Sequence, residues 1–355
     1  MQTPPPAPDQ PETPTFGRAP RHPALRLLRP GLVIVVLLIV VVTLFRQGRS
    51  IDWSETSAQL RSANVWWFGL GLVVFHAGFL LRCYRWRVLL TGAESHEKVV
   101  TANGLPFHSI VGIMYRAWFV NTVTIARAGD AYRGYLLKKR SGASFSSSLG
   151  TIVSERIVDV MVLAVLLISS ILLAFHEHMP RGVPAILAIS AILAVAGPVS
   201  LLFLRRLQPL ILRPLPARVS AKAGVVMAAM IASVRRMPLL VLLSAGGWIG
   251  ETLMLLFVAR AIGIDLPITH AATVALLTAL LTTLPITPGG LGIADAGIIF
   301  LLGTVSVASG PAAAIAILAR VITFGSVVMI GGLWSLLGAV RERPGAPAIF
   351  RPVTR

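Results

Sequence analysis

Residues 149–175 read LGTIVSERIVDVMVLAVLLISSILLAF, and this stretch decides the fold class. An α-helix needs about 20 mostly apolar residues to cross the hydrocarbon core of a bilayer, and this stretch is long enough to do so. It also carries three charged side chains near its beginning, Glu155, Arg156 and Asp159. Because charges are costly inside a membrane, the stretch predicts a membrane-spanning helix whose charges have partners or a function.

The composition of the whole chain points the same way. Of its 355 residues, 55% are hydrophobic and 13% are charged, about half the charged share of a soluble domain. The mean hydropathy is +0.79. The single cysteine, Cys83, excludes a secreted scaffold held by disulfides. We predict an all-α, polytopic membrane protein built as a helical bundle.

The apolar stretches and the tails divide the chain into three parts. The proline-rich segment 1–23 has no apolar periodicity and is predicted to be a disordered cytoplasmic tail. Residues 24–340 form the transmembrane domain, and residues 341–355 form a short basic tail. We predict six full spans, at residues 31–45, 65–90, 149–175, 183–204, 238–262 and 311–338.

Basic residues predict the orientation. The net charge is +18, from 32 Lys+Arg against 14 Asp+Glu. In a soluble protein this excess would indicate nucleic acid, but here the basic residues flank apolar runs, as in the cytoplasmic loops of membrane proteins. We therefore expect no nucleic-acid partner, and we place both termini and the basic segments 82–98, 127–140 and 205–236 in the cytoplasm. Arginine far outnumbers lysine, which is typical of a GC-rich bacterium and predicts a bacterial inner-membrane location.

Two further apolar segments do not fit this orientation as single spans. Segment 106–126 lies between two cytoplasmic basic segments, so it must enter the membrane and return. Segment 270–309 must begin and end on the non-cytoplasmic side of the membrane, and Pro285, Pro288 and Gly289 interrupt its helix. We predict two re-entrant hairpins that enter from opposite faces, an arrangement found in transporters. The alternative is two ordinary short helices in each place.

Ionisable residues inside the apolar stretches need an explanation. Glu155 and Asp159 are four residues apart and share a helix face, and Arg156 is spaced to pair with Asp159. Glu251 lies near the centre of its span, after two glycines whose spacing permits close helix approach. One interpretation is that these charges only lock the helix packing. The other is that they line a polar cavity.

A glycine-rich turn gives a sharper signal. Residues 287–292 read TPGGLG and precede Asp295, which indicates a helix break followed by a new helix start. Backbone N–H groups at such a start bind anions, and a phosphate headgroup would fit. The arginines that could add charge-assisted hydrogen bonds are Arg127, Arg133, Arg156 and Arg320. No zinc spacing, ATP-binding loop or hydrolytic centre is visible, so we expect no enzyme, cofactor or metal site.

Two signatures resemble those of the lysylphosphatidylglycerol synthase transmembrane family, also called the flippase-like domain family. The first comprises residues 121–133 (NTVTIARAGDAYR) and 154–159 (SERIVD), and the second comprises residues 285–297 (PITPGGLGIADAG) and Arg320. The resemblance extends over about residues 25–340, which is nearly the whole membrane part of the chain. Ile125 departs from the family's usual proline, and Asp130 and Asp295 stand where the family usually has glutamate. The two aspartates keep the negative charge of glutamate and shorten the side chain by one methylene.

The resemblance implies that the chain moves a phosphate-bearing lipid between leaflets without its own ATPase. Such a lipid would be a phosphatidylglycerol derivative or a polyprenyl-phosphate glycolipid. The synthases add a soluble aminoacyl-transferase domain, which we expect this chain to lack, and homodimers among relatives make self-association plausible. The alternative is a non-transporting partner of a glycosyltransferase or lipid-modifying enzyme. The residues predicted to contact the headgroup are Arg127, Asp130, Arg133, Glu155, Arg156, Asp159, Glu251, Gly289, Gly290, Gly292, Asp295 and Arg320.

Overall fold

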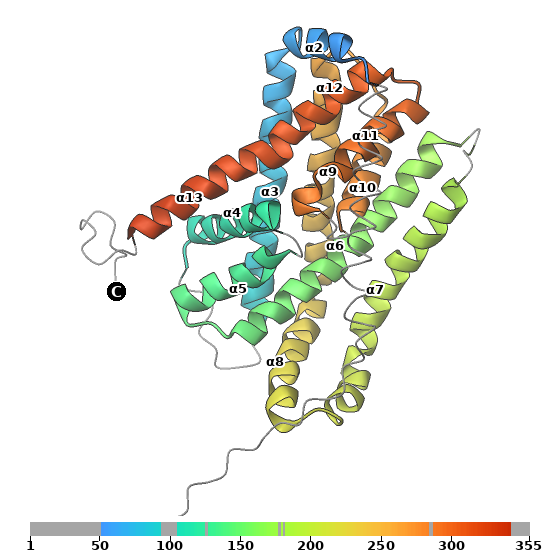
Figure 1. The fold of residues 1–355 in the computed structure, drawn as a ribbon. Helices are drawn as coiled ribbons and strands as arrows, with labels where there is room; N and C mark the ends of the chain where they lie inside the picture. Colours follow the sequence, from blue (N-terminus) through green and yellow to red (C-terminus); the bar gives the residue numbers. More distant parts are fainter. Residues whose placement is uncertain are drawn as a thin grey trace, which may run out of the picture.

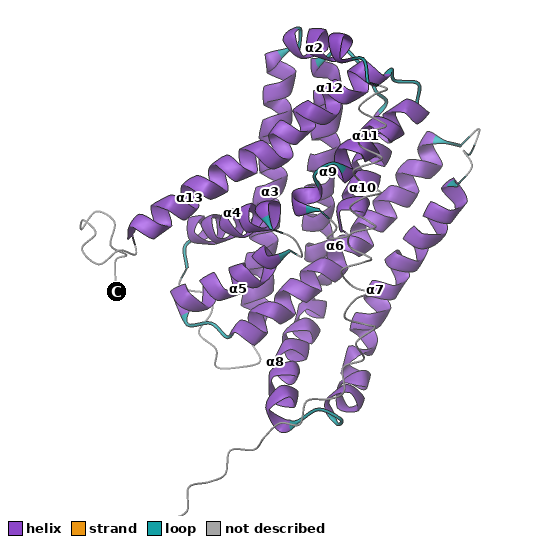
Figure 2. Cartoon of the chain, viewed as in Figure 1, coloured by secondary structure: helices purple, strands orange, loops and turns teal. Residues whose placement is uncertain are grey.

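The computed structural model describes residues 51–93, 105–124, 127–176, 179, 182–283 and 287–341, and within these residues all regular structure is helical (Figures 1 and 2). The α-helices are α2 (Trp53–Arg61), α3 (Val65–Ala93), α4 (Phe107–Val123), α5 (Ala128–Ser141), α6 (Phe145–Ala174), α7 (Val183–Leu212), α8 (Ala217–Ser233), α9 (Met237–Ala261), α10 (Ile268–Thr283), α11 (Ile293–Thr304), α12 (Ser309–Arg320) and α13 (Val327–Arg341). The short elements are the 3-10 turns η3 (Val234–Arg236) and η4 (Pro288–Gly290) and the π-helical turn η5 (Val321–Ser326). The predicted all-α class is confirmed for this part of the chain.

Five helical segments are long and apolar enough to cross a membrane. They overlap five of the six predicted spans and confirm a polytopic bundle. Two of them, Val183–Leu212 and Ala217–Ala261, extend into segment 205–236, which we had expected to be a basic cytoplasmic loop. The sixth predicted span, 31–45, lies outside the described residues, as do the predicted tail 1–23 and all of 341–355 except its first residue. The five segments are Val65–Gly92, Phe145–Ala174, Val183–Leu212, Ala217–Ala261 and Ser309–Gly338.

The first predicted hairpin has different limits from those expected. Helix α4 alone occupies nearly all of segment 106–126, and the returning arm is α5, which we had expected to be part of a basic cytoplasmic loop. Gly129 makes this arm possible, because a side chain there would collide with the carbonyl oxygen of Ala117 on α4. Helix α5 buries Arg133 and Leu137 against its neighbours, while its other basic residues gather in the last turn.

The second predicted hairpin is helical on both sides of a break. Helix α10 forms one arm and α11 the other, and η4 lies between them at the predicted glycine turn. The ends of the two hairpins meet. A Cβ on Gly289 would lie 3.1 Å from the carbonyl oxygen of Thr122, and Arg127 reaches the carbonyl oxygen of Thr282. In Figure 1, α10 and α11 approach this point from above α4 and α5.

Helices α3 and α9 pack closely along their length because glycines remove the side chains between them. A Cβ on Gly78 would lie 3.3 Å from the carbonyl oxygen of Gly247 and 3.6 Å from the Cα of Gly250. Small residues at such a crossing let helix backbones approach, and in a bilayer this packing drives association. The α3–α9 pair brings Arg82 and Arg85 of α3 into the middle of the bundle.

We expect Gly78→Val to lower the unfolding free energy by about 1–3 kcal/mol, because the added methyls must separate two packed backbones. Apparent melting temperature in detergent, followed by size-exclusion chromatography, measures the effect. Gly69→Val is the matched control on the same helix, since no atom lies within 4 Å of a Cβ built there. Equal melting temperatures for the two variants would contradict the close crossing.

Candidate functional site

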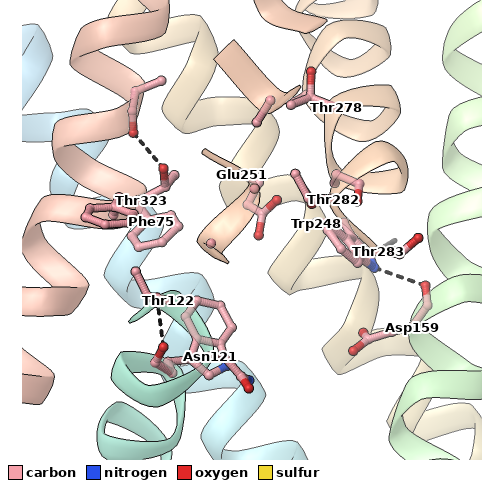
Figure 3. A pocket seen from close by; sticks show the side chains of 18 of the residues that line it. Phe75, Asn121, Thr122, Asp159, Trp248, Glu251, Thr278, Thr282, Thr283 and Thr323 are labelled. Carbon is pink, nitrogen blue, oxygen red and sulfur yellow. Dashed lines mark hydrogen bonds between the residues drawn. The ribbon is translucent and has the colours of Figure 1, made fainter. Parts of the chain in front are cut away.

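A cavity of about 530 Å³ lies where the two hairpin ends meet α3, α6, α9 and α12. Figure 3 shows part of its lining, with the carboxylate of Glu251 between Phe75 and Trp248. Two of the predicted residues, Arg133 and Gly292, do not line the cavity, and lie behind its wall bonded to residues that do. The predicted residues that line it are Arg127, Asp130, Glu155, Arg156, Asp159, Glu251, Gly289, Gly290, Asp295 and Arg320.

Arg85 is the centre of the deepest charge cluster. Its fully buried guanidinium donates to both carboxylate oxygens of Asp159 and, at 2.8 Å, to Glu155. Glu155 also accepts from Arg133 at 2.7 Å, so two arginines share two carboxylates. This arrangement confirms that Glu155 and Asp159 share a helix face. It also links α3, α5 and α6 through buried ion pairs.

Arg82 and Arg85 were not among the site residues predicted from the sequence. Both were expected in a cytoplasmic basic segment, but both are buried in α3 and both line the cavity. Arg82 forms an ion pair with Glu251 at 2.8 Å, and its guanidinium lies over the rings of Trp248 and Trp118. One signal in the sequence could have found them. Both arginines lie before the end of a mostly apolar run that extends to Leu90, so a helix that continues to Leu90 would contain them.

The predicted pair between Arg156 and Asp159 is wrong. Arg156 instead donates to Asp130 on α5, with bonds of 2.9 Å to each carboxylate oxygen. Asp159 is already engaged by Arg85, which approaches from α3 on another side of α6. Asp130 lies in the first turn of α5, so the pair fixes that turn against α6. A contact between helices therefore replaces the contact within one helix that the spacing allowed.

The glycine turn is held by an arginine. Arg320 donates to Asp295 at 2.8 Å and to the carbonyl oxygens of Gly289 and Gly290 at 3.0 and 3.2 Å. Asp295 in turn accepts from the backbone N–H of Gly292 at 2.9 Å. All three glycines have positive φ (56°, 69° and 80°), a conformation that other residues rarely adopt. The Gly292 N–H and the Arg320 guanidinium thus stabilise the turn.

Arg127 differs from the other arginines at the cavity. Arg82, Arg85, Arg156 and Arg320 each pair with at least one carboxylate. Arg127 forms no ion pair with the described residues, and donates only to the carbonyl oxygen of Thr282, at 3.3 Å. It also has a positive φ of 53°, which is uncommon for a residue with a side chain. The local backbone thus holds, between the two hairpin ends, a cation that forms no ion pair with the described residues.

Hydroxyl groups form much of the remaining polar lining, and the sequence analysis did not single them out. Most donate to a carbonyl of their own helix, as Thr282 does to Ala279 and Thr323 does to Ala319, which leaves the oxygen free to accept. The Thr278 and Thr287 hydroxyls are buried without a hydrogen-bond partner. Within the described residues, no group of three or more His, Cys, Asp or Glu is placed to hold a metal ion. The polar uncharged lining residues are Asn121, Thr122, Thr124, Thr278, Thr282, Thr283, Thr287 and Thr323.

Comparison with known proteins places the chain among membrane proteins. The family described as the lysylphosphatidylglycerol synthase TM region matches residues 31–331. A UPF0104 membrane protein of Methanocaldococcus jannaschii is 30% identical over 61% of this chain and 92% of its own length. A UPF0104 membrane protein of Pyrococcus horikoshii is 23% identical over 85% of this chain and 95% of its own. The glycosyltransferase AglD of Haloferax volcanii is 31% identical over 38% of this chain, but over only 19% of its own length.

We expect Arg85→Gln to lower the unfolding free energy by about 3–5 kcal/mol, because two buried carboxylates would lose their shared cation. The apparent melting temperature in detergent measures this loss. Arg85→Gln combined with Asp159→Asn should recover part of it, since the double variant removes one cation and one carboxylate and leaves Glu155 bonded to Arg133. A double variant less stable than the single one would contradict this account of the cluster.

We expect a double-mutant cycle between Asp130→Asn and Arg156→Gln to give a coupling energy of about 1–3 kcal/mol, since the two side chains bond directly. The parallel cycle between Asp159→Asn and Arg156→Gln should give a much smaller value. Unfolding free energies in mixed micelles of a mild detergent and dodecyl sulfate supply the numbers. The reverse ranking would restore the pairing within α6.

Proposed function

The chain belongs to the lysylphosphatidylglycerol synthase TM region family, and from this membership and the central cavity we propose that it translocates a phosphate-bearing lipid between membrane leaflets. The lipid would be a phosphatidylglycerol derivative or a polyprenyl-phosphate glycolipid. The chain would act without its own ATPase and without chemical change to the lipid, so it would not be an enzyme. The cytoplasmic membrane of a bacterium, with both chain termini in the cytoplasm, is the location that the sequence favours.

The observation that carries this proposal is the position of Arg127 at the cavity without an ion pair to a described residue. A guanidinium without a carboxylate partner in a low-dielectric cavity favours an anionic ligand, and phosphate oxygens match its donor geometry. Its present acceptor, the Thr282 carbonyl, is a neutral group at 3.3 Å, so a phosphate would be a stronger acceptor. The hydroxyls of Thr278 and Thr287 would meet the polar part of the headgroup.

The position of Arg127 suits movement as well as binding. It lies between α4 and α5, and its bond to Thr282 bridges the ends of the two hairpins. An anion that replaces Thr282 as the partner would release this bridge. We propose that the hairpins are re-entrant and enter from opposite faces, so that freeing their ends opens the cavity to one leaflet or the other.

A second candidate function is that of a non-transporting membrane partner of a glycosyltransferase. The similarity to part of AglD favours it, because that relative carries a comparable segment within a longer chain named as a glycosyltransferase. A partner of this kind would need its surface and not its cavity. Mutations inside the cavity therefore separate the two candidates.

We expect Arg127→Gln to slow leaflet exchange by about 10- to 100-fold, since a charge-assisted hydrogen bond contributes about 1.5–3 kcal/mol. The measurement uses purified protein in liposomes with labelled phosphatidylglycerol and, separately, a labelled short polyprenyl phosphate. Arg127→Lys should retain part of the activity, because it keeps the charge and loses the planar donor pair.

Arg205→Gln is the matched control, since it removes an arginine that is exposed and lies outside the cavity. Its exchange rate should equal that of the unmodified protein. If neither lipid exchanges, or if Arg127→Gln exchanges at the original rate while remaining folded, the translocase proposal fails and the partner role gains support.

A further inference from the structure

A second concave surface lies outside the central cavity, in a groove of about 1130 Å³ between α5, the start of α6 and α8. Its floor is largely apolar and includes Ala131, Leu149 and Val226. The hydroxyls of Ser144 and Ser146 come from the loop and first turn that join α5 to α6. The described residues that line the groove come from α4, α5, α6, α8 and the loop before α6.

The charge of the groove has one sign. Lys138 on α5 and Lys222 on α8 both line it and both are exposed, and none of the lining residues that the structure describes is acidic. Neither lysine forms an ion pair with a described residue. Further cations follow on the same two helices, with Lys139 and Arg140 in the last turn of α5 and Arg218 near the start of α8. The groove therefore combines an apolar floor with two available ammonium groups on opposite walls.

The surroundings of the groove are those of a membrane surface. Helix α8 continues through η3 into α9, and together they form one of the segments long and apolar enough to cross a bilayer. Tyr132 and Tyr135 line the groove with their rings stacked 6.2 Å apart, and tyrosine is enriched where the apolar core of a membrane meets water. An amphiphile is the ligand class whose two halves match both parts of this surface.

We propose that this groove binds an anionic membrane phospholipid, with one acyl chain on the apolar floor and the phosphate between Lys138 and Lys222. The charge complementarity selects an anionic headgroup, because a lysine near a membrane surface attracts anionic lipid and the described lining offers no acidic side chain to offset it. The apolar floor selects a lipid over a free phosphate ion. This site does not depend on the translocase proposal.

The groove also lies behind one wall of the central cavity. The first turn of α5 places Ala128 and Ala131 at the groove, and places Arg127 and Asp130 at the cavity. A lipid in the groove would press on the outer side of the turn that carries Arg127. The site is therefore positioned to stabilise the hairpin as well as to hold a lipid.

The lysine content of the chain gives a direct test. The chain has four lysines, and two of them line the groove. Reductive methylation with ¹³C keeps the lysine charge and gives each lysine an NMR signal. In phosphatidylcholine nanodiscs with increasing phosphatidylglycerol, we expect the Lys138 and Lys222 signals to shift and saturate. The signal of Lys139, which is on α5 but outside the lining, should move less, and phosphatidylcholine of another chain length or inorganic phosphate should shift neither groove lysine.

Variants test both halves of the site by native mass spectrometry of bound phosphatidylglycerol. Lys138→Gln with Lys222→Gln should weaken binding about 25-fold, or about fivefold for each lysine. Lys139→Gln with Arg218→Gln removes the same charge from the same helices outside the lining, and should keep binding within about twofold. Ala223→Phe fills the floor while both lysines remain, and it should weaken binding about tenfold if an acyl chain lies there.

The proposal is overturned if phosphatidylcholine binds as well as phosphatidylglycerol, if the two double variants behave alike, or if Ala223→Phe has no effect. A lysine shift caused by dimerisation and not by lipid would also overturn it, and would assign the groove to a second copy. None of these results bears on leaflet exchange, which is measured separately.

Discussion

A guanidinium group enclosed by membrane-spanning helices is costly unless carboxylates or other acceptors surround it, and Arg85 shows what this demands of the surrounding fold. Two carboxylates from α6 converge on it, and Ser244 of α9 accepts a further bond. Glu155 also accepts a hydrogen bond from Arg133, which links α5 to the same cluster. The positions of four helices are therefore coupled through one buried side chain, and the cavity lies beside this cluster.

The same requirement explains the outer parts of the cavity. Arg156 and Asp130 join α6 to the first turn of α5, and Arg320 and Asp295 join α12 to the start of α11. Each of these pairs fixes one arm of a hairpin to a helix of the bundle. The two hairpin ends are thus held in place from outside. Among the described residues, they meet at the close approach of Gly289 to Thr122 and at one hydrogen bond from Arg127 to a neutral carbonyl. A rigid frame around a weakly joined centre is the kind of arrangement that a translocated headgroup would need.

Sequence reasoning located most of the candidate site because intramembrane charges are rare and each one needs a reason. It placed Glu155, Asp159 and Glu251 correctly as residues with partners, and the structure brings ten of the twelve predicted residues to one cavity. It failed at Arg82 and Arg85, because a basic residue near the end of an apolar run has the same appearance whether it marks a loop or continues a buried helix. It failed again at the threonines, which are common in membrane helices and carry no distinctive spacing.

The amino-acid sequence by itself determined the class of the protein and the helical spans, because the bilayer imposes a length and an apolar content that can be counted along the chain. It also determined where the chain breaks, since Pro288 and the glycines that follow it disfavour a continuous helix. Only the tertiary structure decided which charges pair. Arg156 was spaced to reach Asp159 and instead bonds Asp130, since electrostatic partners are chosen by distance in space among all helices and not by separation along one. For the same reason, only the fold could leave Arg127 without a carboxylate and place it where two hairpins meet.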